Sequence, residues 1–122
     1  MFEAELDESN RLLKIVVAGH VLPEEAERCL RHLHSLLADI APGFRVLSDL
    51  CGIESMPLDT APHIGQIMKL CTEKGIATVV RVLPSEPRKD IGYAILSQFH
   101  YRPNIKIINC ATLEDAETHL AE

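Results

Sequence analysis

The chain has 122 residues, of which 47% are hydrophobic and 25% are charged, a composition typical of a folded globular domain and unlike that of disordered chains. This length fits one domain, residues 1–122, and leaves no room for a second. Acidic residues outnumber Lys and Arg by 18 to 12, and the net charge of -6 disfavours nucleic acid or an anionic membrane as a partner.

The cysteines indicate a reducing compartment. They are far apart in the sequence and form no C-x-x-C pair, so we expect reduced, mostly buried thiols and a cytoplasmic location. Residues 1–5 lack the basic and apolar regions of an export signal, and no apolar run approaches the roughly 20 residues that span a bilayer. We therefore expect neither export nor membrane insertion. The four cysteines are Cys29, Cys51, Cys71 and Cys110.

The first predicted elements are a β-hairpin and a helix. Apolar and polar residues alternate over 2–6, and an apolar run covers 12–18 after a polar turn, which predicts two paired strands. Between 23 and about 40, apolar residues recur at helical spacing behind a proline that suits a first helical turn. Pro42 and Gly43 then end the helix.

Strands and helices alternate over the rest of the chain. Short apolar runs bounded by turn residues predict strands, and apolar stripes at helical spacing predict helices. Thr112 and Asp115 resemble a capping box with Asp in place of Glu, which begins a terminal helix. In order, we predict a strand at 44–50, a helix at 60–74, a strand at 78–83, a helix at 90–102, a strand at 105–108 and a helix from 112.

This order of elements predicts an α/β fold. We expect a mixed, mostly parallel sheet of about five strands that begins with the N-terminal hairpin and is flanked by about four helices. Ligands of such folds usually lie at the C-terminal ends of the strands. The segments expected at that end are 19–21, 51–60, 84–90 and 109–112.

Over nearly its whole length the chain resembles the STAS domain, which is shared by anti-sigma-factor antagonists and the tails of sulfate transporters. The most specific part is Val46 to Met56, which is similar to the family's apolar strand, Asp-Leu-Ser and short turn before a helix. The resemblance implies a single STAS-like, SpoIIAA-like domain at 1–122. It also implies a non-enzymatic regulatory module that docks a protein partner, such as an anti-sigma-factor-like kinase.

The chain departs from this family at the start of the helix that begins near residue 60. STAS domains that are switched by phosphorylation carry an Asp-Ser-Ser-Gly-like motif there, whereas this chain has Asp59-Thr60-Ala61-Pro62. If Asp59 matches the motif's Asp, the residue usually phosphorylated falls on Ala61, which has no hydroxyl. Thr60 becomes the candidate phospho-acceptor only if the longer turn shifts the register. The favoured interpretation of Thr60 is a helix N-cap whose oxygen accepts a backbone hydrogen bond.

Polar residues near the predicted strand ends form the candidate docking surface. The loops around 51–60 and 84–90 and the start of the helix at 60 supply them. A phosphate on Thr60 or Ser55 would either weaken docking by repulsion or recruit a basic partner. We expect no cofactor, no metal site and no catalytic residue. The candidate partner-binding residues are Asp49, Ser55, Asp59, Thr60, His63, Arg88 and Lys89.

Two other functions stay open. An enzyme would use the Cys51 thiol as a nucleophile, with His63 as its base and Asp49 orienting the imidazole. A carrier or sensor of a small apolar or acidic ligand, shaped like a STAS or CRAL-TRIO domain, would hold its ligand near Met56, Met68 and Phe99.

Metal binding by His32 and His34 is disfavoured, because residues two apart on a helix point about 160° away from each other.

Overall fold

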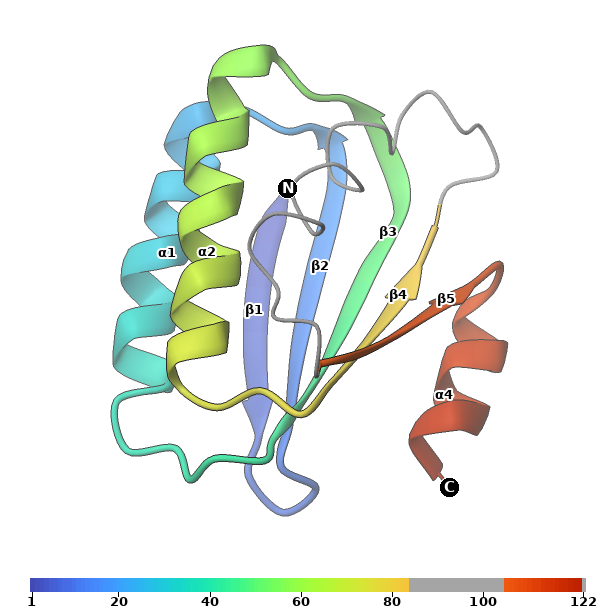
Figure 1. The fold of residues 1–122 in the computed structure, drawn as a ribbon. Coiled ribbons are helices and arrows are strands. Elements are labelled where there is room, and N and C mark those ends of the chain that lie inside the picture. The colour runs from blue at the N-terminus through green and yellow to red at the C-terminus, as the bar shows by residue number, and fades with distance from the viewer. Residues whose placement is uncertain (84–104, 122) are drawn as a thin grey trace.

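A computed structural model describes residues 1–83 and 105–121. Its described strands form one sheet in the order β1-β2-β3-β4-β5, which is also their order in the chain (Figure 1). β1 and β2 pair antiparallel, and every other neighbouring pair is parallel. The predicted mixed, mostly parallel sheet with an N-terminal hairpin is therefore confirmed. The strands are β1 (Phe2–Asp7), β2 (Leu12–His20), β3 (Arg45–Ser55), β4 (Thr78–Val82) and β5 (Lys106–Cys110).

Helices cover both faces of this sheet. α1 (Pro23–Leu36) and α2 (Ala61–Glu73) lie side by side on one face, and α4 (Leu113–Ala121) packs on the other face against β4 and β5 (Figure 1). The described residues thus contain three α-helices, where about four were expected. The predicted helix at 90–102 lies outside the described residues.

The hydrophobic core follows from the alternation of side chains along the strands. In β2, Leu13, Ile15 and Val17 belong to the larger core cluster, under α1 and α2. Leu12 points to the opposite face and joins the smaller cluster with Leu47 and Ala116 of α4. β2 is therefore buried along the side that faces α1 and α2, whereas on the other side Leu12 is buried and Lys14 is exposed.

α1 is shorter than its periodicity predicts. The spacing of apolar residues continues to Ile40, but the helix ends at Leu36 and the chain passes into turns in which the Ile40 amide donates to the Leu37 carbonyl. Pro42 disfavours helical backbone at the residue before it, so the helix has to end early enough to let the chain turn into β3. Ile40 still packs against the core from this turn.

β3 is longer than predicted. The sequence predicts a strand that ends at residue 50 and a loop at 51–60, but the strand continues to Ser55 because the end of β2 offers a partner for it. The pairing contains irregularities on both sides of Gly19, which are signs of a β-bulge. Tertiary pairing here overrides the local preference for a turn at Cys51 and Gly52.

Candidate functional site

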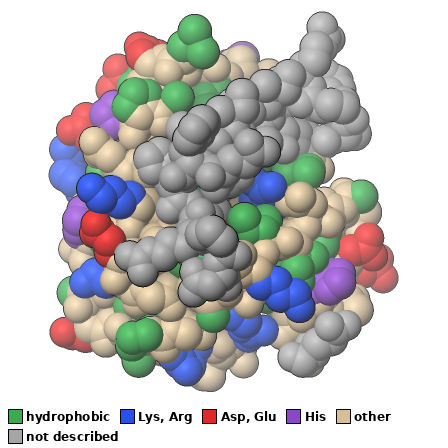
Figure 2. All heavy atoms as spheres, in the orientation of Figure 1, with side chains coloured by type: hydrophobic (Ala, Val, Ile, Leu, Met, Phe, Trp, Pro, Cys, Tyr) green, Lys and Arg blue, Asp and Glu red, His purple; other side chains and the backbone are tan. Residues whose placement is uncertain are grey.

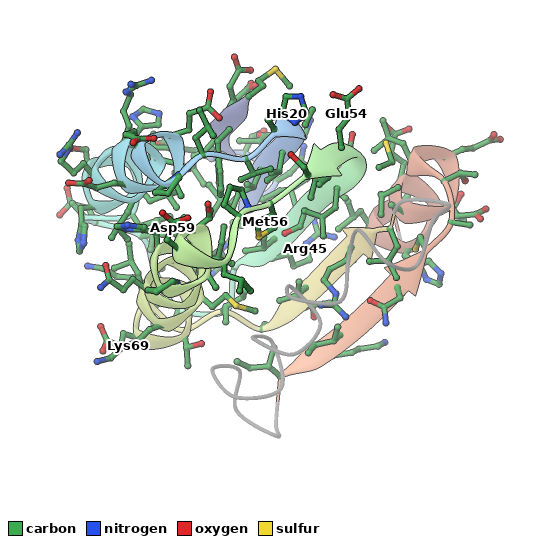
Figure 3. All side chains as sticks on the ribbon, turned by 90° about the horizontal axis from the view of Figure 1, so that it is seen from above. His20, Arg45, Glu54, Met56, Asp59 and Lys69 are labelled. Carbon is green, nitrogen blue, oxygen red and sulfur yellow. The ribbon has the colours of Figure 1, made fainter. Side chains whose placement is uncertain are left out.

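The C-terminal ends of β2 and β3 and the start of α2 meet at one end of the molecule. Figure 3 looks down on this end and shows His20 and Glu54 close together on the two strand ends, with Asp59 near the start of α2. A 3-10 turn, η1 (Leu58–Thr60), leads into α2. We give the name rim to five exposed residues of this end: His20, Glu54, Ser55, Leu58 and Asp59.

The bulge between β2 and β3 brings His20 into this group. Gly52 lies opposite Ala18, and a Cβ at position 52 would approach the Ala18 Cβ to 3.0 Å. Gly19 adopts a φ of +70°, which glycine tolerates better than other residues. After this kink His20 pairs with Ser55 in the sheet, so that two residues far apart in the sequence become neighbours.

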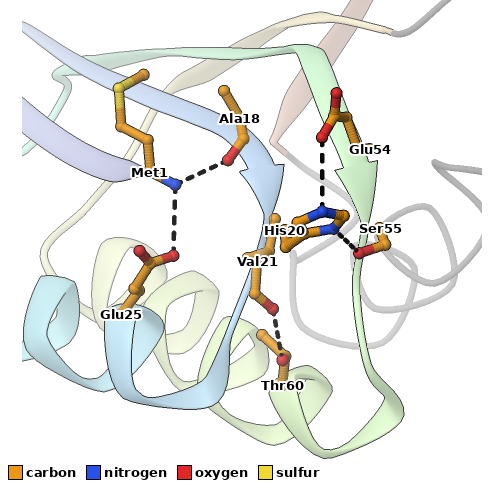
Figure 4. A network of polar contacts seen from close by, with 8 residues as sticks. All are labelled: Met1, Ala18, His20, Val21, Glu25, Glu54, Ser55 and Thr60. Atoms are coloured by element: carbon orange, nitrogen blue, oxygen red, sulfur yellow. Dashed lines mark hydrogen bonds and ion pairs between the residues drawn. The ribbon is translucent and has the colours of Figure 1, made fainter.

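His20 links the two polar side chains at the end of β3 (Figure 4). Its Nδ1 lies 2.6 Å from Ser55 Oγ, and its Nε2 lies 3.7 Å from the Glu54 carboxylate. When Nε2 carries the proton toward Glu54, Nδ1 accepts a hydrogen bond from the Ser55 hydroxyl. In the imidazolium form Nδ1 donates to Ser55 Oγ instead. The His20 imidazole and the Glu54 carboxylate are 70% and 64% exposed, so water solvates both side chains. The Ser55 hydroxyl beside them therefore lacks the water-excluded surroundings of an activated nucleophile.

Thr60 has a structural role that differs from both of its predicted roles. Its side chain is fully buried, and its hydroxyl donates a 2.8 Å hydrogen bond to the Val21 carbonyl oxygen (Figure 4). The residue stands at the N-cap position of α2, but its side chain makes no capping hydrogen bond. The N-cap interpretation is therefore wrong, because Thr60 has helical backbone angles instead of the extended ones of a capping residue and its side chain is turned toward Val21. In the folded structure this hydroxyl is therefore inaccessible to a kinase.

Asp49 and Cys51 pair with each other. The Asp49 carboxylate accepts hydrogen bonds from the Cys51 amide at 3.2 Å and from its thiol at 2.9 Å. This hydrogen bond, with some burial and the nearby negative charge, raises the pKa of the Cys51 thiol. Asp49 thus holds the thiol in its protonated form, whereas a nucleophilic cysteine needs the opposite effect.

His63 does not complete the relay that the enzyme interpretation requires. Its Nδ1 is buried and has no hydrogen-bond partner among the described residues, so no carboxylate orients the imidazole through that nitrogen. The arrangement that the enzyme alternative would need, with Asp49 orienting the His63 imidazole, is not seen among the described residues, because the Asp49 carboxylate bonds directly to the Cys51 thiol.

The structure unites some of the predicted docking residues and separates others. Ser55 and Asp59 are exposed on the rim, Asp49 is half-buried within β3, and Thr60 is buried beneath the rim. Arg88 and Lys89 lie outside the described residues. Of the carrier residues, Met68 is buried in the main core and Met56 packs against it, while Phe99 is not described.

Sequence reasoning missed His20 and Leu58 as members of the rim. His20 directly follows a predicted strand, so its place at the C-terminal edge of a parallel sheet was available from the topology. Leu58 is an apolar residue between Pro57 and Asp59 in a predicted turn, where a buried side chain is unusual. Both signals were present, but no sequence pattern joins His20 to Ser55.

Other site classes find no support among residues 1–83 and 105–121. These residues contain no group of three or more His, Cys, Asp or Glu side chains that could hold a metal ion. All four cysteines are unbridged, and Cys51 is the exposed one while the other three are buried. None of the helices in this part of the chain has the length and apolar character needed to cross a membrane.

Solved structures resemble this chain over almost its whole length. An uncharacterized DUF3478-family protein of Shewanella loihica PV-4, with a SpoIIAA-like fold, is 20% identical, with a TM-score of 0.68 and coverage of 98% of this chain and 92% of that one. The anti-sigma factor antagonist SpoIIAA in its unphosphorylated form is 14% identical, with a TM-score of 0.63 and coverage of 99% and 98%. An anti-sigma factor antagonist from Mycobacterium paratuberculosis is 20% identical, with a TM-score of 0.57 and coverage of 100% and 94%.

No protein-family profile and no curated protein matches the chain. The structural similarities nevertheless show that it has the SpoIIAA-like fold, in a divergent, STAS-like form. The resemblance to STAS domains that the sequence indicates is thus confirmed at the level of the fold.

Proposed function

We propose that this protein is a non-enzymatic regulatory module that docks a protein partner through the rim. The observation that carries the proposal is the exposure of Leu58, whose side chain is 93% accessible to solvent in η1, next to the acidic Asp59. A leucine so exposed contributes nothing to the core, but burying it against a partner is worth about 1.5–3 kcal/mol. The unbridged cysteines support a cytoplasmic location.

A second exposed leucine extends this apolar feature. Leu22 is 45% exposed at the residue before α1, and the hydrogen bond from Thr60 to Val21 ties that point of the chain to η1. Figure 2 shows hydrophobic side chains at the upper end of the molecule, with acidic side chains beside them. An apolar centre with a charged border is the usual anatomy of a protein docking surface.

The charged side chains of the rim indicate which kind of partner surface would complement it. Glu54 and Asp59 are exposed carboxylates, and His20 is the basic group of the rim. A partner with an apolar socket for Leu58 and Lys or Arg side chains around it complements this surface. The two solved structures described as anti-sigma factor antagonists support a regulatory role through their shared fold.

Ser55 is the better phospho-acceptor in this proposal, because its hydroxyl is exposed while that of Thr60 is buried. A phosphate on Ser55 would add about two negative charges beside Glu54 and would compete for His20. It would repel an acidic partner surface or strengthen docking to a basic one. The effect of a Ser55→Glu variant on docking therefore reports the charge of the partner.

Affinity capture from cells that express this protein tests the proposal. The rim variant Leu58→Ala/Asp59→Lys is compared with wild type and with the control variant Leu113→Ala/Glu114→Lys, which changes an exposed leucine and its acidic neighbour on α4. The expected result is a protein that wild type and the control retain and that the rim variant loses.

Two results would overturn the proposal. If wild type and the rim variant retain the same proteins, the rim is not the docking surface. If the purified protein turns over a metabolite, and one substitution removes that turnover, the module is an enzyme. Native mass spectrometry of the protein from its own cells tests the carrier alternative, since a retained small molecule would favour that function.

A further inference from the structure

A groove runs along the edge of β1 that no other described strand covers, away from the rim. It has a volume of about 520 Å³ and lies against both β1 and α1. On the side that faces α1 it is lined by Phe2 and Ala4 from the strand and by Arg28, Cys29 and His32 from the helix. This volume falls within the 300–1,000 Å³ that ligand sites commonly occupy. The groove is therefore large enough for a short stretch of extended chain.

Within residues 1–83 and 105–121, no strand other than β2 pairs with the backbone of β1. Among the described strands β1 stands at one end of the sheet and has β2 as its single neighbour. The Met1 nitrogen donates to the Ala18 carbonyl at 2.8 Å, and the Ala18 amide donates to the Met1 carbonyl at 2.9 Å. In an antiparallel ladder such doubly bonded pairs alternate with unbonded ones.

This alternation fixes which groups point outward. Met1 pairs with Ala18, so Glu3 and Glu5 form the next doubly bonded pairs with β2. The amide N–H and carbonyl groups of Phe2, Ala4 and Leu6 consequently point away from β2, and of these three residues Phe2 and Ala4 line the groove. They offer an added strand three residues with both a donor and an acceptor, which is the basis of β-strand addition.

The side chains of β1 give this edge two different faces. Phe2, Ala4 and Leu6 are half-buried and pack against the main core on the side of α1. Glu3 and Glu5 are exposed on the opposite face, where Lys14 of β2 also lines the groove and stands directly opposite Glu5. A strand added beside β1 would place alternate side chains between β1 and α1, where apolar groups fit, and the others next to the two carboxylates.

The same carboxylates disfavour a second copy of this chain as the occupant. Two β1 strands that pair antiparallel about Ala4 would set Glu3 of each directly opposite Glu5 of the other. Pairing centred on Glu5 would set that residue against its own copy. Like charges in directly opposite positions destabilise a sheet, so the groove suits a partner with Lys or Arg at those positions.

We propose that the edge of β1 binds an extended segment of another protein as an added antiparallel strand, with basic residues opposite Glu3 and Glu5 and small apolar residues facing α1. The acidic residues then lie in the unbonded pairs of the new ladder, where opposing Cα atoms approach to about 4.5 Å and opposite charges interact best. This surface is separate from the rim, so its test is independent of the docking function proposed above.

The hexapeptide acetyl-Lys-Val-Lys-Val-Lys-Val-amide is the probe, titrated to millimolar concentration into isotope-labelled protein. The expected result is saturable binding with protection from hydrogen exchange of the Phe2, Ala4 and Leu6 amides. The peptide acetyl-Lys-Lys-Lys-Val-Val-Val-amide has the same composition without the alternation and is expected to bind at least tenfold more weakly. Equal affinity for both peptides, or no protection in β1, overturns the proposal.

Two charge variants of the protein test whether the peptide binds by pairing with β1 or only by general electrostatic attraction. Glu3→Lys/Glu5→Lys is expected to weaken binding about tenfold, since two favourable cross-strand pairs become repulsive. The control Glu73→Lys/Glu117→Lys makes the same change in net charge at exposed sites on α2 and α4 and is expected to keep most of the affinity.

Ala4→Pro removes an outward-pointing amide that β2 does not use, so the hairpin is expected to form while peptide binding is lost. Circular dichroism checks the fold of this variant. If the control charge variant loses as much affinity as the β1 charge variant, the proposal is wrong.

Discussion

The Thr60 hydroxyl donates its 2.8 Å hydrogen bond to the carbonyl oxygen of Val21, and this bond joins the entrance of α2 to the segment that leaves β2. The Val21 amide in turn donates to the Ser55 carbonyl at 2.8 Å, so Val21 bonds to both segments that frame the rim. The rim is thus held by buried backbone contacts, while its exposed side chains are free to vary.

Replacing Thr60 tests this connection. Thr60→Val keeps the shape of the side chain but removes the donor, and it is expected to lower the free energy of unfolding by about 1–3 kcal/mol because a buried carbonyl loses its partner. Thr60→Ser keeps the hydroxyl and should cost less. Urea denaturation measures both variants, and a valine variant as stable as wild type would show that the bond has no structural role.

Gly75 and Gly19 allow a matched test of backbone conformation. Both have positive φ, +92° and +70°, but a Cβ at position 75 would lie 2.7 Å from the Pro42 Cβ, whereas nothing lies within 4 Å of one at position 19. Gly19→Ala is expected to cost about 1–2 kcal/mol for its conformation alone. Gly75→Ala should cost at least about 1 kcal/mol more, because Pro42 has to move. Thermal or urea unfolding measures the difference, and equal losses would contradict it.

Asp7 is expected to make stability depend on pH in acid. Hydrogen bonds from Ser9 and Asn10 lower the pKa of its carboxyl from 3.8 to about 2. Because the folded pKa lies below the unfolded one, the stabilisation is complete above pH 3.8 and is lost as the pH falls toward 2. Carbon NMR of the Asp7 carboxyl measures the pKa directly. Asp7→Asn should show a weaker loss of stability between pH 5 and 2, and an unchanged acid dependence would contradict the prediction.

Cys51 is expected to be alkylated selectively but slowly. It is the exposed cysteine of the four, yet the hydrogen bond to Asp49 raises the pKa of its thiol. In the native protein iodoacetamide should therefore modify Cys51 before the buried thiols, at a rate below that of a free cysteine at pH 7.5. Asp49→Asn is expected to increase the rate. Mass spectrometry over time follows the reaction, and a rate above that of free cysteine would support the enzyme interpretation instead.

Local sequence patterns were sufficient to predict most of the helices and strands. The apolar stripes that predict helices at 23–40 and 60–74 reflect faces that are buried in the core, and α1 and α2 form there. The predicted capping pair is half confirmed, since the Asp115 amide donates to Thr112 Oγ1 at 3.1 Å at the start of α4. Such features depend on neighbours in the sequence, which is why they can be predicted from it.

The candidate site was harder to predict because it depends on contacts between distant segments. The extension of β3 to Ser55 exists only because β2 provides a partner beyond its bulge. The role of Thr60 likewise depends on Val21, which precedes α1. A hydroxyl before a helical stripe looks like a cap in the sequence, and its actual partner is visible only when the two segments are assembled.

The order of the strands in the sheet follows their order in the chain. Each new strand therefore has its partner ready when the ribosome releases it, and assembly can advance from the hairpin outward without waiting for the C-terminus. Long searches for distant partners slow the folding of many β-rich proteins, and this arrangement avoids them. A nascent chain that ends after β4 should already contain the whole rim, which makes early engagement of a partner during synthesis physically feasible.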